Sequence, residues 1–381
     1  METKTKWNPV LIFVFFTLLS CYSQDPKVEK IDYSVQEKFI SSGNSLAQFY
    51  FFNQVRNDTL LIFNSFNYSI DLVDLKLDSL VKRFKFEFNG PNAVNDIRAF
   101  YFHNRDSIFL AEENFSVALV NSKGELKNRY TDFLSRFPLE EKNKVYSNSP
   151  SLEFASQILY DPSQKEILLY FMPFDQPEKK RIFAAYSLES GKSKSLPIHL
   201  PEQYLDKKLD LSKLFLTSGT VDKSGFTYLF SGSPLVFRYD FQTQKVTSTE
   251  VNPPWDKVKA DDIPFGSMSS EQKQDFMKEN PFYYKIYFDP YRNLYYRLSS
   301  PPRPNATEPD FHYVNYNTIC VTVLDKELQV LDHLFLPKEN VYNVGFSFVT
   351  SEGLWISYNG ANQDDENWIK GDLIKFDKVT N

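Results

Sequence analysis

The chain repeats one arrangement of strands six times, and this repeat limits the possible folds more than any other feature. In each unit a short strand leads through a tight polar turn into a very apolar strand, and a second hairpin follows. The turns are rich in Asn, Asp, Pro, Gly and Ser, which suit hairpins. They lie at 56–58, 104–106, 161–164, 222–225, 289–293 and 350–353. The repeat is therefore four strands long, with a period of about 50 to 65 residues.

The strand after each of these turns is almost continuously apolar, as at 60–63 and 167–171. A strand has this composition when both faces of its sheet are covered. Four-stranded units set around a ring cover one another in that way. The pattern therefore predicts an all-β fold, a six-bladed β-propeller of four-stranded antiparallel blades. Two tandem β-sandwiches are the competing architecture.

The two ends of the chain distinguish these architectures. The sixth unit stops after its third strand, and near the other end the strand-like segment Val28–Ser34 belongs to no unit. A propeller closes its ring when a strand from one terminus completes the blade made by the other. We therefore predict a single propeller domain over 28–381, with its last blade closed by 28–34. A pair of sandwiches explains neither observation.

The first 20 residues have the form of a secretory leader. Two lysines precede the apolar run Val10–Leu19, which is too short to span a bilayer. The run leads through a small residue into Cys21, and this pattern resembles the bacterial lipobox. The resemblance implies removal of residues 1–20, lipidation of Cys21 and a short tether over 21–27. We expect a protein anchored to the bacterial outer membrane through its N-terminal lipid, facing the periplasm or the cell surface.

Composition excludes several classes of protein. The net charge is −6 and long basic runs are missing, so nucleic-acid binding is not expected. The four histidines are widely spaced without an HExxH or paired-cysteine pattern, so we expect neither a metal nor another cofactor. With Cys21 acylated, Cys320 has no disulfide partner and is predicted to be a small buried residue of a monomeric domain. The aromatic run 282–296 is predicted to pack between blades.

The long connections all fall at equivalent positions of the repeat. They join second to third strands or one unit to the next, so in a propeller they share one face. The segments are 131–156, 199–218, 252–282, 299–317 and 357–371. Long loops on a rigid scaffold commonly carry function. The pattern predicts that this face binds a partner, either a glycan, a peptide or a protein of the cell envelope.

Polar and aromatic residues in or directly beside these segments are the candidate ligand-binding residues. Arginines there can bind a carboxylate or another anion, and acids beside a tryptophan can bind sugar hydroxyls or a cation. The candidates are Trp255, Arg297, Arg303, His312, Asp364, Asp365 and Trp368. For each of them the alternative is a solvated loop charge or a ring packed on the rim of the domain.

The run Tyr287–Arg297, together with the leader and the aromatic repeats, resembles an uncharacterised Bacteroidota lipoprotein family. That family is a domain of unknown function with propeller-like repeats, so the resemblance implies a fold but no activity and no catalytic residues. The favoured hypothesis is a lipoprotein that binds a partner. Two alternatives stay open: a propeller hydrolase or lactonase acting at the central channel, and a structural subunit of an envelope complex.

Overall fold

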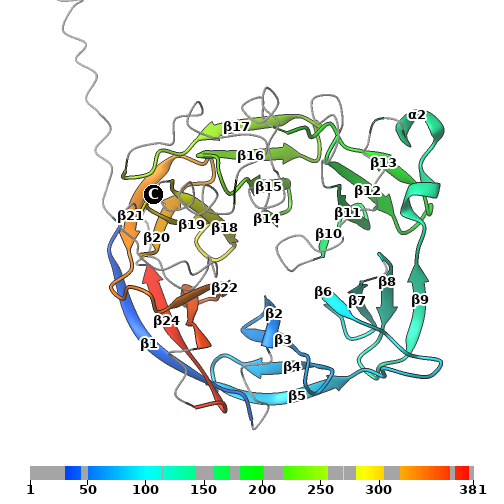
Figure 1. Cartoon of the computed structure of the whole chain (residues 1–381), viewed down its shortest axis with the longest axis horizontal. Helices are drawn as coiled ribbons and strands as arrows, with labels where there is room; N and C mark the ends of the chain where they lie inside the picture. Colours follow the sequence, from blue (N-terminus) through cyan, green and yellow to red (C-terminus); the bar gives the residue numbers. More distant parts are fainter. Residues whose placement is uncertain are drawn as a thin grey trace, which may run out of the picture. The chain divides into compact units, whose positions relative to one another are not determined.

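The chain folds into six four-stranded antiparallel sheets arranged around a common centre (Figure 1). The computed structural model describes residues 31–43, 50–113, 115–142, 144, 158–171, 181–200, 218–255, 269, 280–303, 318–360 and 365–376. Residues Ile31–Asn381 form one compact unit. The predicted fold, an all-β six-bladed propeller, is confirmed.

The first three blades are built from consecutive strands, the first of each lying innermost (Figure 1). Blade 1 contains β2 (Tyr50–Arg56), β3 (Thr59–Asn64), β4 (Ser69–Asp74) and β5 (Ser79–Lys85). Blade 2 contains β6 (Ile97–Asn104), β7 (Ser107–Glu112), β8 (Val117–Val120) and β9 (Leu126–Tyr130). The short helices η2 (Phe133–Arg136) and α2 (Leu139–Lys142) follow. Blade 3 contains β10 (Leu159–Asp161), β11 (Glu166–Tyr170), β12 (Phe183–Ser187) and β13 (Ser193–Ser195).

The remaining blades repeat this order except at the last strand. Blade 4 contains β14 (Ser218–Val221), β15 (Gly225–Leu229), β16 (Leu235–Asp240) and β17 (Val246–Glu250). Blade 5 contains β18 (Phe282–Asp289), β19 (Leu294–Ser300), β20 (Cys320–Leu324) and β21 (Val330–Phe335). Blade 6 contains β22 (Tyr342–Val349), β23 (Leu354–Tyr358), β24 (Trp368–Phe376) and, as its outermost strand, β1 (Tyr33–Ser41).

Strand β1 closes the ring, as the ends of the sequence predicted. It pairs antiparallel with β24 from Tyr33 opposite Phe376 to Ser41 opposite Trp368. Its residue Ile40 is 1% exposed and packs in a cluster shared by blades 6 and 1. The predicted position of the strand was wrong, because 28–34 overlaps β1 only at its last two residues. An outermost strand exposes most of its side chains, so the true strand is polar and resembles a loop in sequence.

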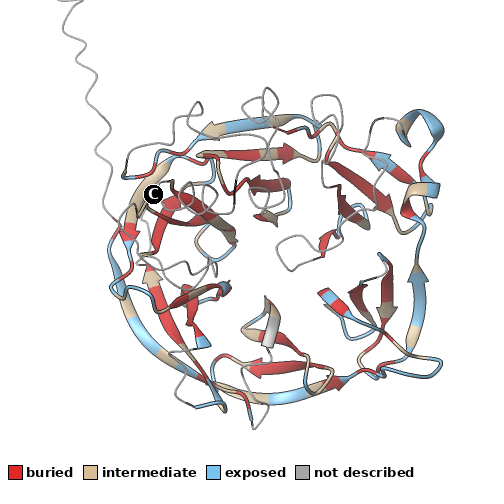
Figure 2. Cartoon of the chain, viewed as in Figure 1, coloured by how far each residue is buried: buried red, intermediate tan, exposed pale blue. Residues whose placement is uncertain are grey.

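The core lies between blades rather than inside any one of them. Every residue of the second strands β15, β19 and β23 is buried, whereas the outer strands β5, β9 and β17 are largely exposed (Figure 2). Hydrophobic clusters join neighbouring blades, for example blades 5 and 6 around Tyr296. Cys320 is fully buried with a free thiol, and Tyr283 and Tyr295 are each 1% exposed. The predicted burial of Cys320 is thus confirmed. In the aromatic run, Phe282, Tyr283, Tyr295 and Tyr296 are buried as predicted, whereas Tyr291 is exposed.

The tight turns between first and second strands follow the chemistry of their residues. Asn57 and Asp58 both have positive φ, 47° and 57° respectively, as a two-residue type I′ hairpin requires. First-to-second connections are short in every blade, and third-to-fourth connections are short in blades 1 to 5. The longest connections are 131–158, 196–217, 251–281 and 301–319. Within the described residues, no helix is long and apolar enough to cross a membrane.

Candidate functional site

A cavity of about 1130 Å³ lies at the centre of the ring. The innermost strand of every blade contributes to its wall, namely β2, β6, β10, β14, β18 and β22. Residues of the short turns at 162–163, 222–224, 290–293 and 326–327 also line it. The cavity therefore lies toward the face that carries the short turns. Its size is slightly above the range of about 300 to 1,000 Å³ that is usual for sites holding small organic ligands.

The lining is rich in aromatic rings and balanced in charge. The aromatic residues are Phe100, Tyr101, Tyr160, Tyr287, Phe288, Tyr291, Tyr295 and Phe348. The charged residues are the acids Asp161, Asp222 and Glu327 and the bases Lys223, Arg238 and Lys326. Acids and bases are equal in number, so this lining does not favour a highly charged ligand of either sign.

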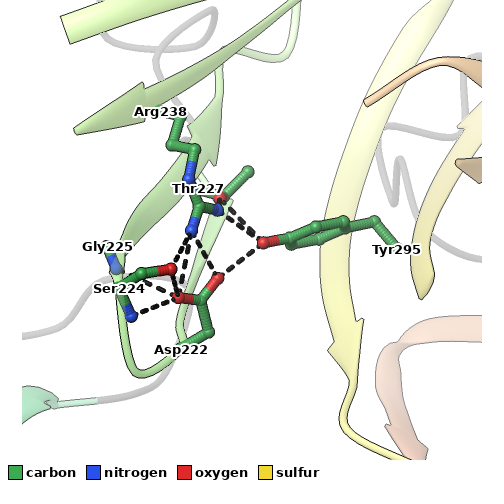
Figure 3. Close-up of polar contacts among 6 residues, drawn as sticks. All are labelled: Asp222, Ser224, Gly225, Thr227, Arg238 and Tyr295. Atoms are coloured by element: carbon green, nitrogen blue, oxygen red, sulfur yellow. Dashed lines mark hydrogen bonds and ion pairs between the residues drawn. The ribbon is translucent and has the colours of Figure 1, made fainter. Parts of the chain in front are cut away.

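A polar network joins blades 4 and 5 in the cavity wall (Figure 3). The Arg238 guanidinium donates to both oxygens of Asp222 at 3.0 and 2.9 Å, and to the Tyr295 hydroxyl at 2.5 Å. The Tyr295 hydroxyl in turn donates to Asp222 at 2.6 Å. Burial opposes ionisation of Asp222, but the hydrogen bonds from Tyr295 and Ser224 and the charge of Arg238 outweigh it and hold the pKa of Asp222 below its usual value. The network fixes this wall with an ionised carboxylate at its centre.

Carboxylates at the start of the first turn recur around the cavity. Asp161 accepts a hydrogen bond from the Ser163 amide at 2.8 Å, and Asp289 accepts one from the Tyr291 amide at 2.8 Å. Asp222 plays the same part in blade 4. Such side-chain bonds to the next residues of the backbone stabilise tight turns. These acids were recognised in the sequence as turn residues only, although two of them, Asp161 and Asp222, also line the cavity.

Aromatic side chains of blades 2 and 3 form a second wall. The rings of Tyr101 on β6 and Tyr160 on β10 have centroids 5.1 Å apart, and His103 lies 5.5 Å from Tyr160. Burial raises the pKa of both tyrosines. Burial, assisted by the nearby charge of Arg56, lowers the pKa of His103, so this imidazole is neutral at pH 7. In the part of the chain that the structure describes, neither tyrosine hydroxyl forms a hydrogen bond.

The inner strands of blades 5 and 6 are joined beside the cavity. The Tyr287 hydroxyl donates to the carbonyl oxygen of Ser347 at 2.9 Å. Lys285, two residues earlier on β18, donates to the carbonyl oxygen of Gly345 at 2.6 Å. Burial by the surrounding protein lowers the pKa of Lys285 to about 8, so an appreciable fraction of this amine is neutral in mildly basic solution.

Arg297, predicted to bind a ligand anion, lies in the interior. Its side chain is fully buried and donates to the carbonyl oxygens of Pro234 and Val251, each at 3.0 Å. The guanidinium also lies 4.5 Å from the ring centroid of Tyr283. Burial lowers the pKa of Arg297 to about 10, which leaves it charged at neutral pH. The residue joins blades 5 and 4 and has no exposed surface with which to meet a ligand.

The other predicted ligand residues that are described lie away from the cavity lining. Trp255 packs against Phe335 with ring centroids 6.1 Å apart, and Arg303 is half-buried just after β19. Trp368 is 40% exposed at the start of β24, and Asp365 accepts a hydrogen bond from a backbone amide two residues on. Outside the described residues lie Cys21, His312 and Asp364.

The predicted binding face stays a prediction, because much of each long connection lies outside the described residues. Within the described residues, no group of three or more His, Cys, Asp or Glu side chains is placed to hold a metal ion. One sequence signal could have predicted the cavity, namely the residues on either side of the first turn in each repeat. In a propeller the first strand of every blade is innermost, so these residues come together at the centre of the ring.

Fold and site together define a six-bladed β-propeller with a ligand-sized central cavity. The chain belongs to the family described as Domain of unknown function (DUF4221), whose model matches residues 23–332. This agrees with the resemblance to an uncharacterised family.

Two solved structures resemble the whole domain. A DUF4221 family member from Bacteroides vulgatus is 20% identical with a TM-score of 0.73, over 93% of this chain and 100% of that one. A protein from Bacteroides fragilis, named as a candidate exported protein, is 9% identical with a TM-score of 0.54, over 90% of this chain and 96% of that one. No curated protein matches the chain in sequence. At these identities the likeness concerns the fold alone.

Proposed function

We propose that this protein is a binding protein whose ligand occupies the central cavity. The observation that carries the proposal is the cavity itself, about 1130 Å³ with a wall of aromatic rings and a few oriented polar groups. Known ligand sites have this composition, apolar surface for affinity and a small number of polar atoms for orientation. The inter-blade network of Asp222, Arg238 and Tyr295 supports it by holding part of the wall in one arrangement before a ligand arrives.

The test introduces a tryptophan into the cavity and compares its effect on binding with that of a tryptophan on the outer surface of the same blade. Thr220 on β14 lines the cavity, whereas Thr247 on β17 is exposed on the outer strand of blade 4. A library of neutral saccharides, peptides and small aromatic compounds is screened against the purified protein by ligand-detected NMR. We expect at least one class to bind the parent and T247W but not T220W. If no class binds, or if T220W binds like the parent, the proposal is wrong.

We further propose that the binding domain is held at the outer membrane by lipid on Cys21. The support is the leader of lysines, apolar run and small residue that ends at this cysteine. Two acyl chains suffice for stable anchoring. Because β1 begins at Tyr33 rather than Val28, the segment between lipid and ring is longer than the sequence alone indicated. The tether reaches roughly 3.3 to 3.6 Å per residue when extended.

Metabolic labelling tests the anchor. Cells expressing the full chain are grown with an alkyne-bearing palmitate, and the protein is probed for incorporated label. The parent and C320S should carry label and sediment with membranes, while C21S should lose both properties. Equal labelling of C21S and the parent would contradict the anchor without affecting the cavity.

A further inference from the structure

We propose that the ligand is a neutral saccharide, and that the wall formed by blades 2 and 3 recognises its hydroxyl groups. This inference rests on the proposed function, because it names the ligand class of the same cavity. It is carried by the polar side chains that line the cavity. The network of Asp222, Arg238 and Tyr295 is already paired, whereas the wall of blades 2 and 3 has several groups that are not.

Three polar groups on the wall of blades 2 and 3 are available to a ligand. The hydroxyls of Tyr101 and Tyr160 form no hydrogen bond with any residue that the structure describes. Asp161 uses Oδ1 to hold its turn, while Oδ2 has no hydrogen bond among the same residues. After burial, the charge of Asp161 contributes to the raised pKa of both tyrosines, so the three groups lie near one another.

The network of Asp222, Arg238 and Tyr295 between blades 4 and 5 is saturated by comparison. Asp222 accepts from Arg238 and Tyr295 and also from the amide and hydroxyl of Ser224. The Tyr295 hydroxyl both donates to Asp222 and accepts from Arg238. A ligand that bonded to these atoms would have to displace existing charge-assisted bonds, which are stronger than neutral ones. The groups of Tyr101, Tyr160 and Asp161 are open to a ligand without such a displacement.

The free groups match the chemistry of a polyol. A sugar hydroxyl donates one hydrogen bond and accepts others, so it can bond to a phenol and to a carboxylate at once. Tyr101 and Tyr160 supply donors, and Asp161 supplies an acceptor. The same two phenol rings, with His103 beside them, provide apolar surface for the carbon-bound faces of a sugar ring. Donors, an acceptor and ring surface thus occur together at one place in the wall.

The charges around this wall favour a neutral ligand. After burial, the charge of Arg56 acts on the pKa of both His103 and Tyr101, and the charge of Asp161 acts on that of both tyrosines. An anion near the tyrosines would meet the Asp161 carboxylate, and an organic cation near His103 and Tyr101 would meet the charge of Arg56. Like charges brought together in an interface cost binding energy, so either ion is disfavoured relative to a neutral polyol.

The test measures binding by calorimetry with the full chain. The probes are glucose, galactose, mannose, N-acetylglucosamine and their short oligomers, with choline and inorganic phosphate as charged probes. Y101F and Y160F remove one hydroxyl each and keep the ring, and Y33F removes a hydroxyl from the exposed outer strand as control. We expect a saccharide to bind, each cavity variant to lose about 3- to 10-fold in affinity, and Y33F to bind like the parent. Neutral binding should also be almost independent of salt concentration.

Each other outcome overturns a distinct part of the inference. If a peptide, choline or phosphate binds in a T220W-sensitive way and no saccharide does, the ligand class is wrong and the cavity function stands. If a saccharide binds but Y101F and Y160F match Y33F, the assignment to this wall is wrong. If none of the probes binds, both the saccharide inference and the proposed binding function are wrong. Thermal melting identifies a variant that fails to fold. If Y160F fails, the affinity of Y101F decides the test, because Tyr101 is only half-buried.

Discussion

The packing of β1 between blades 6 and 1 can be tested by truncating one buried and one exposed side chain of this strand to alanine. Ile40 is 1% exposed and packs with Ile369 and Leu373 in the cluster shared by blades 6 and 1. I40A removes three carbons, worth about 0.8 kcal/mol each, or roughly 2.4 kcal/mol of transfer free energy. Incomplete collapse of the resulting cavity adds to this, so the free energy of unfolding should fall by about 3 kcal/mol. The neighbouring Phe39 is 45% exposed, so it serves as the control.

The assay is urea unfolding followed by circular dichroism. F39A removes a partly exposed ring that lies 5.6 Å from the Lys370 amine, so it should cost no more than about 1 kcal/mol. I40A should lower the midpoint while leaving the slope with urea unchanged, as expected when only stability differs. If I40A unfolds at the parent's midpoint, or if F39A is as damaging as I40A, then β1 does not close the ring in the register described.

Three further predictions follow from single residues. A β carbon at Gly371 would lie 2.5 Å from a backbone oxygen of β23, so G371A should lower stability by about 1–3 kcal/mol in thermal unfolding. G360A has open space and should stay within about 0.5 kcal/mol of the parent. Burial raises the pKa of Cys320 to about 12, so mass spectrometry should find it unlabelled by iodoacetamide until urea is added. Hydrogen bonds from Tyr358 and, to a smaller extent, from Lys338 lower the pKa of Glu37. The Glu37 carboxylate therefore stabilises the fold above about pH 4.5, and this contribution is lost as the pH falls further. The stability difference between the parent and E37Q should accordingly shrink between pH 7 and pH 3; a constant difference would contradict it.

The ring was predictable because its main requirement is visible in local patterns. Strands such as β15 and β19 are apolar at nearly every position since blades cover both their faces, and the turns before them contain turn-forming residues. The closing strand was misplaced because only Ile40 of β1 is fully buried, so the strand lacks a strong apolar pattern. Burial between blades is readable from composition, whereas an exposed edge strand is not.

The candidate site was harder to predict because it depends on which residues meet across the ring. Arg297 was expected at the surface, since an arginine is costly to bury. Two backbone carbonyl oxygens and the face of Tyr283 offset that cost, and none of these partners is adjacent in sequence. Tyr101 and Tyr160 come from different blades, and their proximity follows only from the arrangement of β6 beside β10.

The pairing of β1 with β24 also governs the order in which the molecule can be completed. Tyr33 pairs with Phe376, so β1 can join blade 6 only after β24 has been synthesised. Almost the entire chain thus separates β1 from the other three strands of its blade. Contacts so distant in sequence make folding slow, and unpaired strand edges are sites of aggregation in the meantime. Until β24 has been synthesised, β1 therefore has no partner strand and the ring cannot close. Completion of the ring is a single late event that both seals the fold and forms the full circumference of its cavity.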